Sequence, residues 1–137
     1  MITIMNTRGK SKRTPPILPN LLIDYPIMEI QKRQIKDIVI ADISGILDTA
    51  TSPEANATIQ GYLDSGHQKL LINLDKTEYM SSSGLRVLLA AAKKLMAING
   101  TLKICQPNKV VKDILDTSGF SVIMDVTATE AEALDGM

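Results

Sequence analysis

The spacing of hydrophobic and polar residues along the chain predicts alternating strands and helices. A weakly alternating stretch at 29–33 and a β-branched stretch at 37–43 predict two strands, joined by a hairpin turn at 36–37. The serine and glycine at 44–45 are expected to end the second strand. The nearly continuous apolar run at 69–74 predicts an interior strand that is buried on both faces.

Helical periodicity and capping residues predict four helices. Ser52 is expected to cap the first helix, which continues to about Leu63, because a hydroxyl residue followed by proline and an acid favours a helix start. The clearest periodicity lies at 85–98, and two more helices are expected within 107–119 and 127–134. The residues predicted to face the sheet are Leu85, Leu88, Leu89, Ala92, Leu95 and Met96 in the second helix, and Val110, Val111, Ile114 and Leu115 in the third.

Two short strands, at 101–105 and 120–124, complete the predicted elements. One hairpin followed by alternating helices and strands implies a mixed sheet of four or five strands, with about four helices mainly on one face. The predicted fold class is therefore α/β. A length of 137 residues with 45% hydrophobic content suits a single domain with one core.

The composition argues against several function classes. Fifteen basic residues balance fifteen acidic ones and aromatic residues make up 3%, which disfavours nucleic-acid binding. One cysteine and one histidine cannot form an internal disulfide or a structural zinc site, and this favours a reducing, cytoplasmic setting. No apolar run approaches the roughly 20 residues of a spanning helix, so no membrane insertion is expected. The glycine loops that cradle nucleotide phosphates are absent, so we expect no nucleotide enzyme and no cofactor. Asp48, Asp75 and Glu78 are scattered acids near strand ends, and we expect them to be solvated loop residues rather than metal ligands.

Residues 1–27 differ in composition from the rest of the chain. They contain four basic residues against one acid, and four of the six prolines. They also lack the apolar segment of a secretory signal. We therefore expect a flexible, basic, proline-containing extension, followed by one domain over 28–137. An alternative is that the apolar residues at 21–23 form a short docking peptide.

Three consecutive serines lie at the junction between a predicted strand and the second helix. They are Ser81, Ser82 and Ser83, and Gly84 follows them. Hydroxyl groups beside the unpaired N–H groups of a helix start form a place where a phosphate is easily held. The same serines would also serve as a simple helix cap, with the glycine allowing close packing. Both readings stay open from the residues, since one hydroxyl group can do both.

Three ordered blocks of the sequence match a known family. Residues 45–54 contain a Gly-x-Leu-Asp motif and then Pro-Glu, residues 70–85 contain an apolar strand and then Ser-Ser-Ser-Gly-Leu, and 108–120 form a helix ending in Ser-Gly-Phe. This order resembles the STAS domains of the anti-sigma factor antagonist type. The resemblance covers about residues 29–135 and implies their fold. The family's Asp-Ser-Ser-Gly-Leu motif has Ser81 here in place of the aspartate.

The resemblance implies a regulatory protein rather than an enzyme, with no catalytic residues. In this family the unphosphorylated antagonist binds an anti-sigma factor that is also a serine kinase, and so frees a sigma factor. Phosphorylation of the antagonist ends the association, and a protein phosphatase reverses it. Ser82 aligns with the phosphoacceptor, with the serines on either side as alternatives. The residues expected at the partner surface are Asp48, Ser81, Ser82, Ser83, Gly84 and Arg86.

Two other functions are weighed against this one. A STAS adaptor that regulates a transporter ATPase or a signalling scaffold without phosphorylation is compatible with the loss of the family's aspartate. A receiver-like phosphoaspartate domain is suggested by Asp75 at the end of a buried strand, although 42–44 offers one carboxylate for magnesium rather than a pair. His67 is predicted to be a solvated turn histidine and Cys105 a buried thiol.

Overall fold

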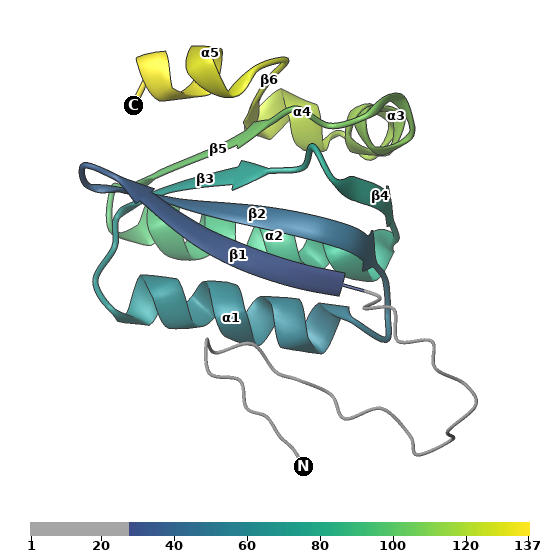
Figure 1. The fold of residues 1–137 in the computed structure, drawn as a ribbon, viewed down its shortest axis with the longest axis horizontal. Coiled ribbons are helices and arrows are strands. Elements are labelled where there is room, and N and C mark those ends of the chain that lie inside the picture. The colour runs from purple at the N-terminus through teal and green to yellow at the C-terminus, as the bar shows by residue number, and fades with distance from the viewer. Residues whose placement is uncertain (1–27) are drawn as a thin grey trace.

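The computed structural model describes residues 28–137, and this part of the chain forms six strands and five helices (Figure 1). The strands are β1 (Met28–Ile35), β2 (Ile38–Leu47), β3 (Lys69–Asn73), β4 (Thr77–Met80), β5 (Thr101–Cys105) and β6 (Asp125–Thr127). The helices are α1 (Ser52–Asp64), α2 (Ser82–Ala97), α3 (Lys109–Thr117), α4 (Phe120–Ile123) and α5 (Glu130–Asp135). The extension and the docking peptide predicted within 1–27 lie outside the described residues.

The strands form one mixed sheet in the order β1-β2-β3-β5-β6, with β4 paired to β2. The first pair is antiparallel, which confirms the predicted hairpin, and all other pairs are parallel. The prediction that β2 ends at 44–45 was wrong. Gly45 has a φ of 96° and its N–H donates to the carbonyl of Lys76 at 2.9 Å, so the pairing shifts register there and β2 continues beside β4.

The two faces of the sheet are covered unequally, as Figure 1 shows. The main core lies between the sheet and α1 to α4, and each fully buried leucine or isoleucine there contributes about 1.5–3 kcal/mol. A smaller cluster lies under α5 on the opposite face, which we call the outer face. It consists of Ile38, Ile40, Leu71, Cys105 and Ala133, with Leu134 and Met137 packed against them. The predicted α/β fold, with helices mainly on one face, is confirmed.

Helix α2 has the helical periodicity that the sequence predicts, but its buried stripe is rotated slightly. Met96 was expected to face the sheet and is 65% exposed. Val87 and Ala91 are buried instead, beside the correctly predicted Leu88 and Leu95. The stripe is centred on these residues because Gly84 brings the start of the helix close to β2 and β4.

The C-terminal third departs most from the prediction. The expected strand at 120–124 is the short helix α4, which Gly119 introduces with a φ of 85°, and the last strand is β6. Val110 was expected to face inward in α3 and is 51% exposed, whereas Val111 and Leu115 are buried as predicted. A tetrapeptide with one aromatic and two β-branched residues resembles a strand in sequence, but Phe120 fits the main core as part of a helical turn.

Candidate functional site

The serine cluster lies at the edge of the sheet where β4 leads into α2. Ser81 is the N-cap of α2, and its Oγ accepts a hydrogen bond from the N–H of Ser83 at 3.1 Å. Its own N–H donates to the carbonyl of Leu47, the last residue of β2, at 2.9 Å. Serine therefore supplies the capping bond that the family's aspartate would supply, but without a negative charge. The first turn of α2 contains no acidic residue.

The loop after β2 lies beside this helix start and is ordered by its own side chains. Asp48 Oδ1 accepts hydrogen bonds from the N–H groups of Ala50 at 2.9 Å and Thr51 at 3.1 Å. The buried Thr51 hydroxyl donates to the carbonyl of Ile46 at 2.7 Å. The predicted cap Ser52 is the first helical residue instead, and Thr51 is the N-cap of α1. One oxygen of Asp48 is thus engaged in shaping the loop.

Two contacts join this loop to the serine cluster. The hydroxyl groups of Thr49 and Ser83 lie 3.1 Å apart, within hydrogen-bonding distance. Gly84 is buried so closely against β2 and β4 that an added Cβ would lie 2.7 Å from the carbonyl oxygen of Leu47 and 2.7 Å from Cγ of Met80. Glycine is required there for the helix to approach the strands. We call the surface formed by residues 48–51 and 81–86 the switch surface.

Two residues of the switch surface have polar side chains without a hydrogen-bond or ion-pair partner in the part of the chain that the structure describes. Ser82 and Arg86 are both exposed, and neither side chain has a hydrogen bond or ion pair with any residue from 28 to 137. The other predicted site residues are engaged: Asp48 in its loop, Ser81 in the cap, Ser83 with Thr49, and Gly84 in packing. The predicted residues therefore come together, and they divide into structural and unpartnered groups.

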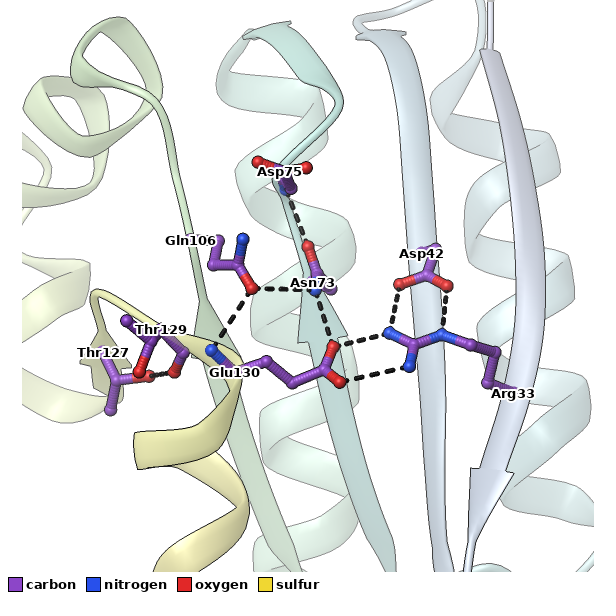
Figure 2. A network of polar contacts seen from close by, with 8 residues as sticks. All are labelled: Arg33, Asp42, Asn73, Asp75, Gln106, Thr127, Thr129 and Glu130. Carbon is purple, nitrogen blue, oxygen red and sulfur yellow. Dashed lines mark hydrogen bonds and ion pairs between the residues drawn. The ribbon is translucent and has the colours of Figure 1, made fainter.

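A second polar cluster, which the sequence did not reveal, lies on the outer face of the sheet (Figure 2). Arg33 of β1 donates to both carboxylate oxygens of Asp42 in β2, at 2.6 and 2.9 Å, and to both of Glu130 in α5, at 3.1 and 2.5 Å. Asn73 donates to Glu130 at 2.8 Å, and Gln106 accepts from the N–H of Glu130 at 3.2 Å. We call this cluster the clamp, because its contacts connect α5 to β1, β2, β3 and the residue that follows β5.

The contacts within the clamp shift the pKa values of Arg33 and Glu130. The hydrogen bonds that Arg33 donates to Asp42 first, and then to Glu130, raise the pKa of Arg33. The guanidinium of Arg33 in turn lowers the pKa of Glu130; partial burial opposes this effect, and the amide of Asn73 adds to it. Bidentate arginine–carboxylate pairs are among the stronger polar contacts in proteins. No sequence motif marks these residues, since they are brought together only by the pairing of β1 with β2 and by the docking of α5.

Three other residues that the sequence singled out are Cys105, His67 and Asp75. Cys105 is fully buried under α5, which agrees with the prediction, and burial, with a smaller effect of Glu130, raises the pKa of its thiol to about 12. His67 follows the turn that ends α1 and is half-buried. Asp75 is exposed beyond β3, and its predicted companion Asp42 is held by Arg33 in the clamp. That pairing disfavours the magnesium site of a receiver-like domain.

Residues 28–137 show neither a cluster of metal ligands nor a membrane-spanning helix. No three side chains among their histidines, cysteines, aspartates and glutamates gather as a metal site would require. None of the five helices in this range is both long enough and apolar enough to cross a membrane.

Comparison with known sequences finds relatives that are named as anti-sigma factor antagonists. BtrV of Bordetella bronchiseptica, named as a candidate anti-sigma factor antagonist, is 29% identical over 106 residues, which cover 77% of this chain and 91% of BtrV. The anti-sigma F factor antagonist of Paenibacillus polymyxa is 28% identical over 108 residues, covering 78% of this chain and 92% of that protein.

Comparison with solved structures agrees with these relatives. SpoIIAA of Bacillus in its phosphorylated form has a TM-score of 0.62 at 25% identity, covering 77% of this chain and 96% of that one. The anti-sigma factor antagonist SpoIIAA in its unphosphorylated form also has a TM-score of 0.62, at 23% identity, covering 77% and 94%. The sequence model of the STAS domain family matches residues 29–133. This chain therefore belongs to the STAS domain family.

Proposed function

We propose that this protein is an anti-sigma factor antagonist that binds an anti-sigma factor with serine kinase activity through the switch surface. Binding would free a sigma factor, and phosphorylation of Ser82 by the bound kinase would end the association. A protein phosphatase would reverse the modification. In this proposal the chain is a cytoplasmic regulatory protein rather than an enzyme, and it needs no cofactor. The observation that carries the proposal is the exposed, unpartnered hydroxyl of Ser82 beside residues 48–51.

The structure favours Ser82 over its two neighbours as the phosphoacceptor. The Oγ of Ser81 is occupied by the capping hydrogen bond, so modifying it would remove a stabilising contact from α2. The Oγ of Ser83 is paired with Thr49. Ser82 can accept a phosphate without breaking any side-chain contact with the residues described. The modified protein would therefore keep its fold while its surface changes.

The physical basis of the switch is a charge change at a surface that a partner must approach closely. A phosphate adds about −1.5 to −2 charges at neutral pH. A helix N-terminus tolerates this charge, whereas a partner packed over it would have to desolvate a dianion. A differential affinity of about 3 kcal/mol would change binding roughly 150-fold, which is enough to release the partner. The phosphorylated structure of the relative SpoIIAA supports the idea that this fold carries the modification.

A kinase assay tests the proposal directly. The protein is incubated with ATP and a serine kinase of the anti-sigma factor type, and the modified position is located by mass spectrometry. We expect one phosphate, on Ser82, in the wild type and in the control Ser83→Ala, and none in Ser82→Ala. Ser82→Ala should also stay bound to the kinase in the presence of ATP, whereas Ser82→Asp should bind about tenfold more weakly, a loss of about 1.4 kcal/mol.

A second candidate function is a constitutive adaptor that regulates a transporter ATPase or a signalling scaffold without phosphorylation. The replacement of the family's aspartate by Ser81, which leaves no acid in the first turn of α2, is the observation that favours it. The same assay separates the two functions. A chain that stays unmodified while binding its partner tightly would support the adaptor, and phosphate on Ser81 or Ser83 would move the switch by one residue.

A further inference from the structure

Arg86 lies one helical turn after Ser82, and its side chain has no hydrogen bond or ion pair with residues 28–137. The two residues are at positions i and i+4 of α2, which is a regular helix from Ser82 to Ala97. Side chains at this spacing lie on the same face and are close enough to pair. Both are exposed, so neither side chain is confined by packing. A guanidinium at this distance can reach a group attached to the Oγ of Ser82.

The surroundings of Arg86 contain no carboxylate that would compete within its helix. The neighbours three and four residues away are Ser82, Ser83, Leu89 and Ala90. By contrast, both lysines of α3 that begin an i,i+4 pair have an aspartate in place: Lys109 pairs with Asp113 at 3.3 Å and Lys112 with Asp116 at 2.9 Å. Arg86 thus has a serine four residues before it in its helix, whereas each of these two lysines of α3 has an aspartate four residues after it.

We propose that Arg86 is the intramolecular partner of a phosphate on Ser82, and that it stabilises the phosphorylated state of the protein. This inference rests on the proposed function for its biological meaning. Arginine presents a planar fork of N–H donors that matches two phosphate oxygens at once. The pair forms when the phosphate is attached and breaks when it is removed. Arg86 therefore acts as a positioning residue for the modified serine.

The replacement of the family's aspartate by Ser81 strengthens this pairing. An aspartate at that position would repel a neighbouring dianion, whereas a serine cap does not. Other acids lie on the elements packed against the start of α2: Asp48 in the loop after β2, Glu54 in the first turn of α1, and Glu78 in β4. These acids oppose the second ionisation of the phosphate, and Arg86 favours it. All of them are unchanged in a variant that replaces Arg86 alone.

The pairing predicts a measurable property of the phosphorylated chain. The full-length protein is made with phosphoserine inserted at position 82 during translation, so that no kinase is needed. The second pKa of the phosphate is then followed by ³¹P NMR. We expect this pKa to be about 0.5 units lower in the wild type than in Arg86→Gln, which is about a threefold change in the ionisation constant. Arg86→Lys should give an intermediate value, because lysine keeps the charge but not the fork.

The control is Lys93→Gln, which removes an exposed charge further along α2. It should leave the phosphate pKa at the wild-type value. Equal phosphate pKa values in the wild type and Arg86→Gln would overturn the inference.

The dependence of the phosphate pKa on Arg86 can be measured whether or not the proposed function is correct. If no kinase modifies Ser82 but the phosphate pKa depends on Arg86, the inference about the pair stands while the proposed switch fails. If a kinase does modify Ser82 and the pKa is insensitive to Arg86, the switch stands and Arg86 belongs to the partner surface alone.

Discussion

Arg33 and Arg86 are both arginines on regular elements of this protein, yet the structure surrounds them differently. Arg33, in the clamp on the outer face, directs its guanidinium at two carboxylates and makes four hydrogen bonds with them. Arg86, on the switch surface, has none with residues 28–137. A cation whose donors are occupied stabilises the fold, and one whose donors are unpartnered is available to a ligand or a modification.

The same contrast separates the two polar regions as a whole. A groove of about 450 Å³ lies on the outer face beside the clamp, and Arg33, Asp42, Asn73 and Gln106 are among its lining residues. These four side chains bind one another or Glu130, whereas Ser44, Asp75 and Lys76, which also line the groove, have no side-chain hydrogen bond or ion pair with residues 28–137. The switch surface contains hydroxyl groups, the carboxylate of Asp48 and one cation, and its exposed residues Ser82 and Arg86 have no side-chain hydrogen bond or ion pair with residues 28–137. The four clamp side chains in the groove are therefore engaged within the fold, whereas Ser82 and Arg86 are not.

The largest expected effect tests how rigidly the switch surface is held. Gly84→Ala would place a Cβ 2.7 Å from the backbone oxygen of Leu47, and we expect it to lower the free energy of unfolding by about 3 kcal/mol. Gly61→Ala is the matched control, because no atom lies within 4 Å of its added Cβ and the site is inside α1. It should stabilise the protein by about 0.5–1 kcal/mol. Urea unfolding of both variants gives the two values, and similar values would show that α2 does not depend on this close approach.

The second prediction compares the two arginines directly. Arg33→Ala leaves the partly buried carboxylates of Asp42 and Glu130 without their cation, and should lower the free energy of unfolding by about 2 kcal/mol. Arg86→Ala should change it by less than about 0.5 kcal/mol, because the exposed Arg86 has no hydrogen bond or ion pair with residues 28–137 to lose. Chemical denaturation measures both. An equal loss in the two variants would mean that the clamp contributes no more than an exposed side chain.

The third prediction concerns pH. The pKa of Glu130 is lowered in the folded protein, mainly by Arg33, so its ionised form stabilises the fold. This stabilisation is present above the ordinary value of 4.5 and is lost as the pH falls through the lower folded value. Stability should therefore decrease less steeply below pH 4.5 in Glu130→Gln than in the wild type.

The control for the pH experiment is Glu78→Gln, which removes an exposed carboxylate that has no partner among residues 28–137. It should retain the wild-type slope. Part of the acid sensitivity will persist in Glu130→Gln, because Ser121 first, and then Lys112, lower the pKa of Asp116 as well. Identical slopes for the wild type and Glu130→Gln in urea unfolding between pH 3.5 and 6 would contradict the role assigned to the clamp.

Much of the fold could be predicted because local signals agree with tertiary packing. The hairpin, β3, α2 and β5 were expected from period, turn residues and capping, and they form within a few residues of the predicted bounds. The strand β4 was missed, since it has only four residues and its buried residues are the first and the last, so it shows no alternating pattern. The strand β4 forms because the bulge at Gly45 changes the direction of β2, so that the end of β2 pairs with β4. That is a tertiary effect with no local signature.

The two polar regions also differ in whether their residues could be predicted from the sequence. The switch surface could be predicted because its residues are nearly contiguous in two segments and match a known family. The clamp could not, because Arg33 and Glu130 are 97 positions apart and each looks like an ordinary surface charge in the sequence. What the sequence also could not supply is the difference among the three serines, which depends on which hydroxyl group already has a partner.

The smallest expected effects test that difference among the serines. Ser81→Ala removes the cap of α2 and should lower the free energy of unfolding by about 1 kcal/mol. Ser83→Ala loses one exposed hydroxyl contact with Thr49 and should cost about 0.5 kcal/mol. Ser82→Ala should be neutral within about 0.5 kcal/mol, since its Oγ has no partner among the described residues. Thermal unfolding of the three variants ranks them. A loss in Ser82→Ala as large as that in Ser81→Ala would mean that this hydroxyl has a structural role, and it would remove the distinction on which the choice of Ser82 as phosphoacceptor depends.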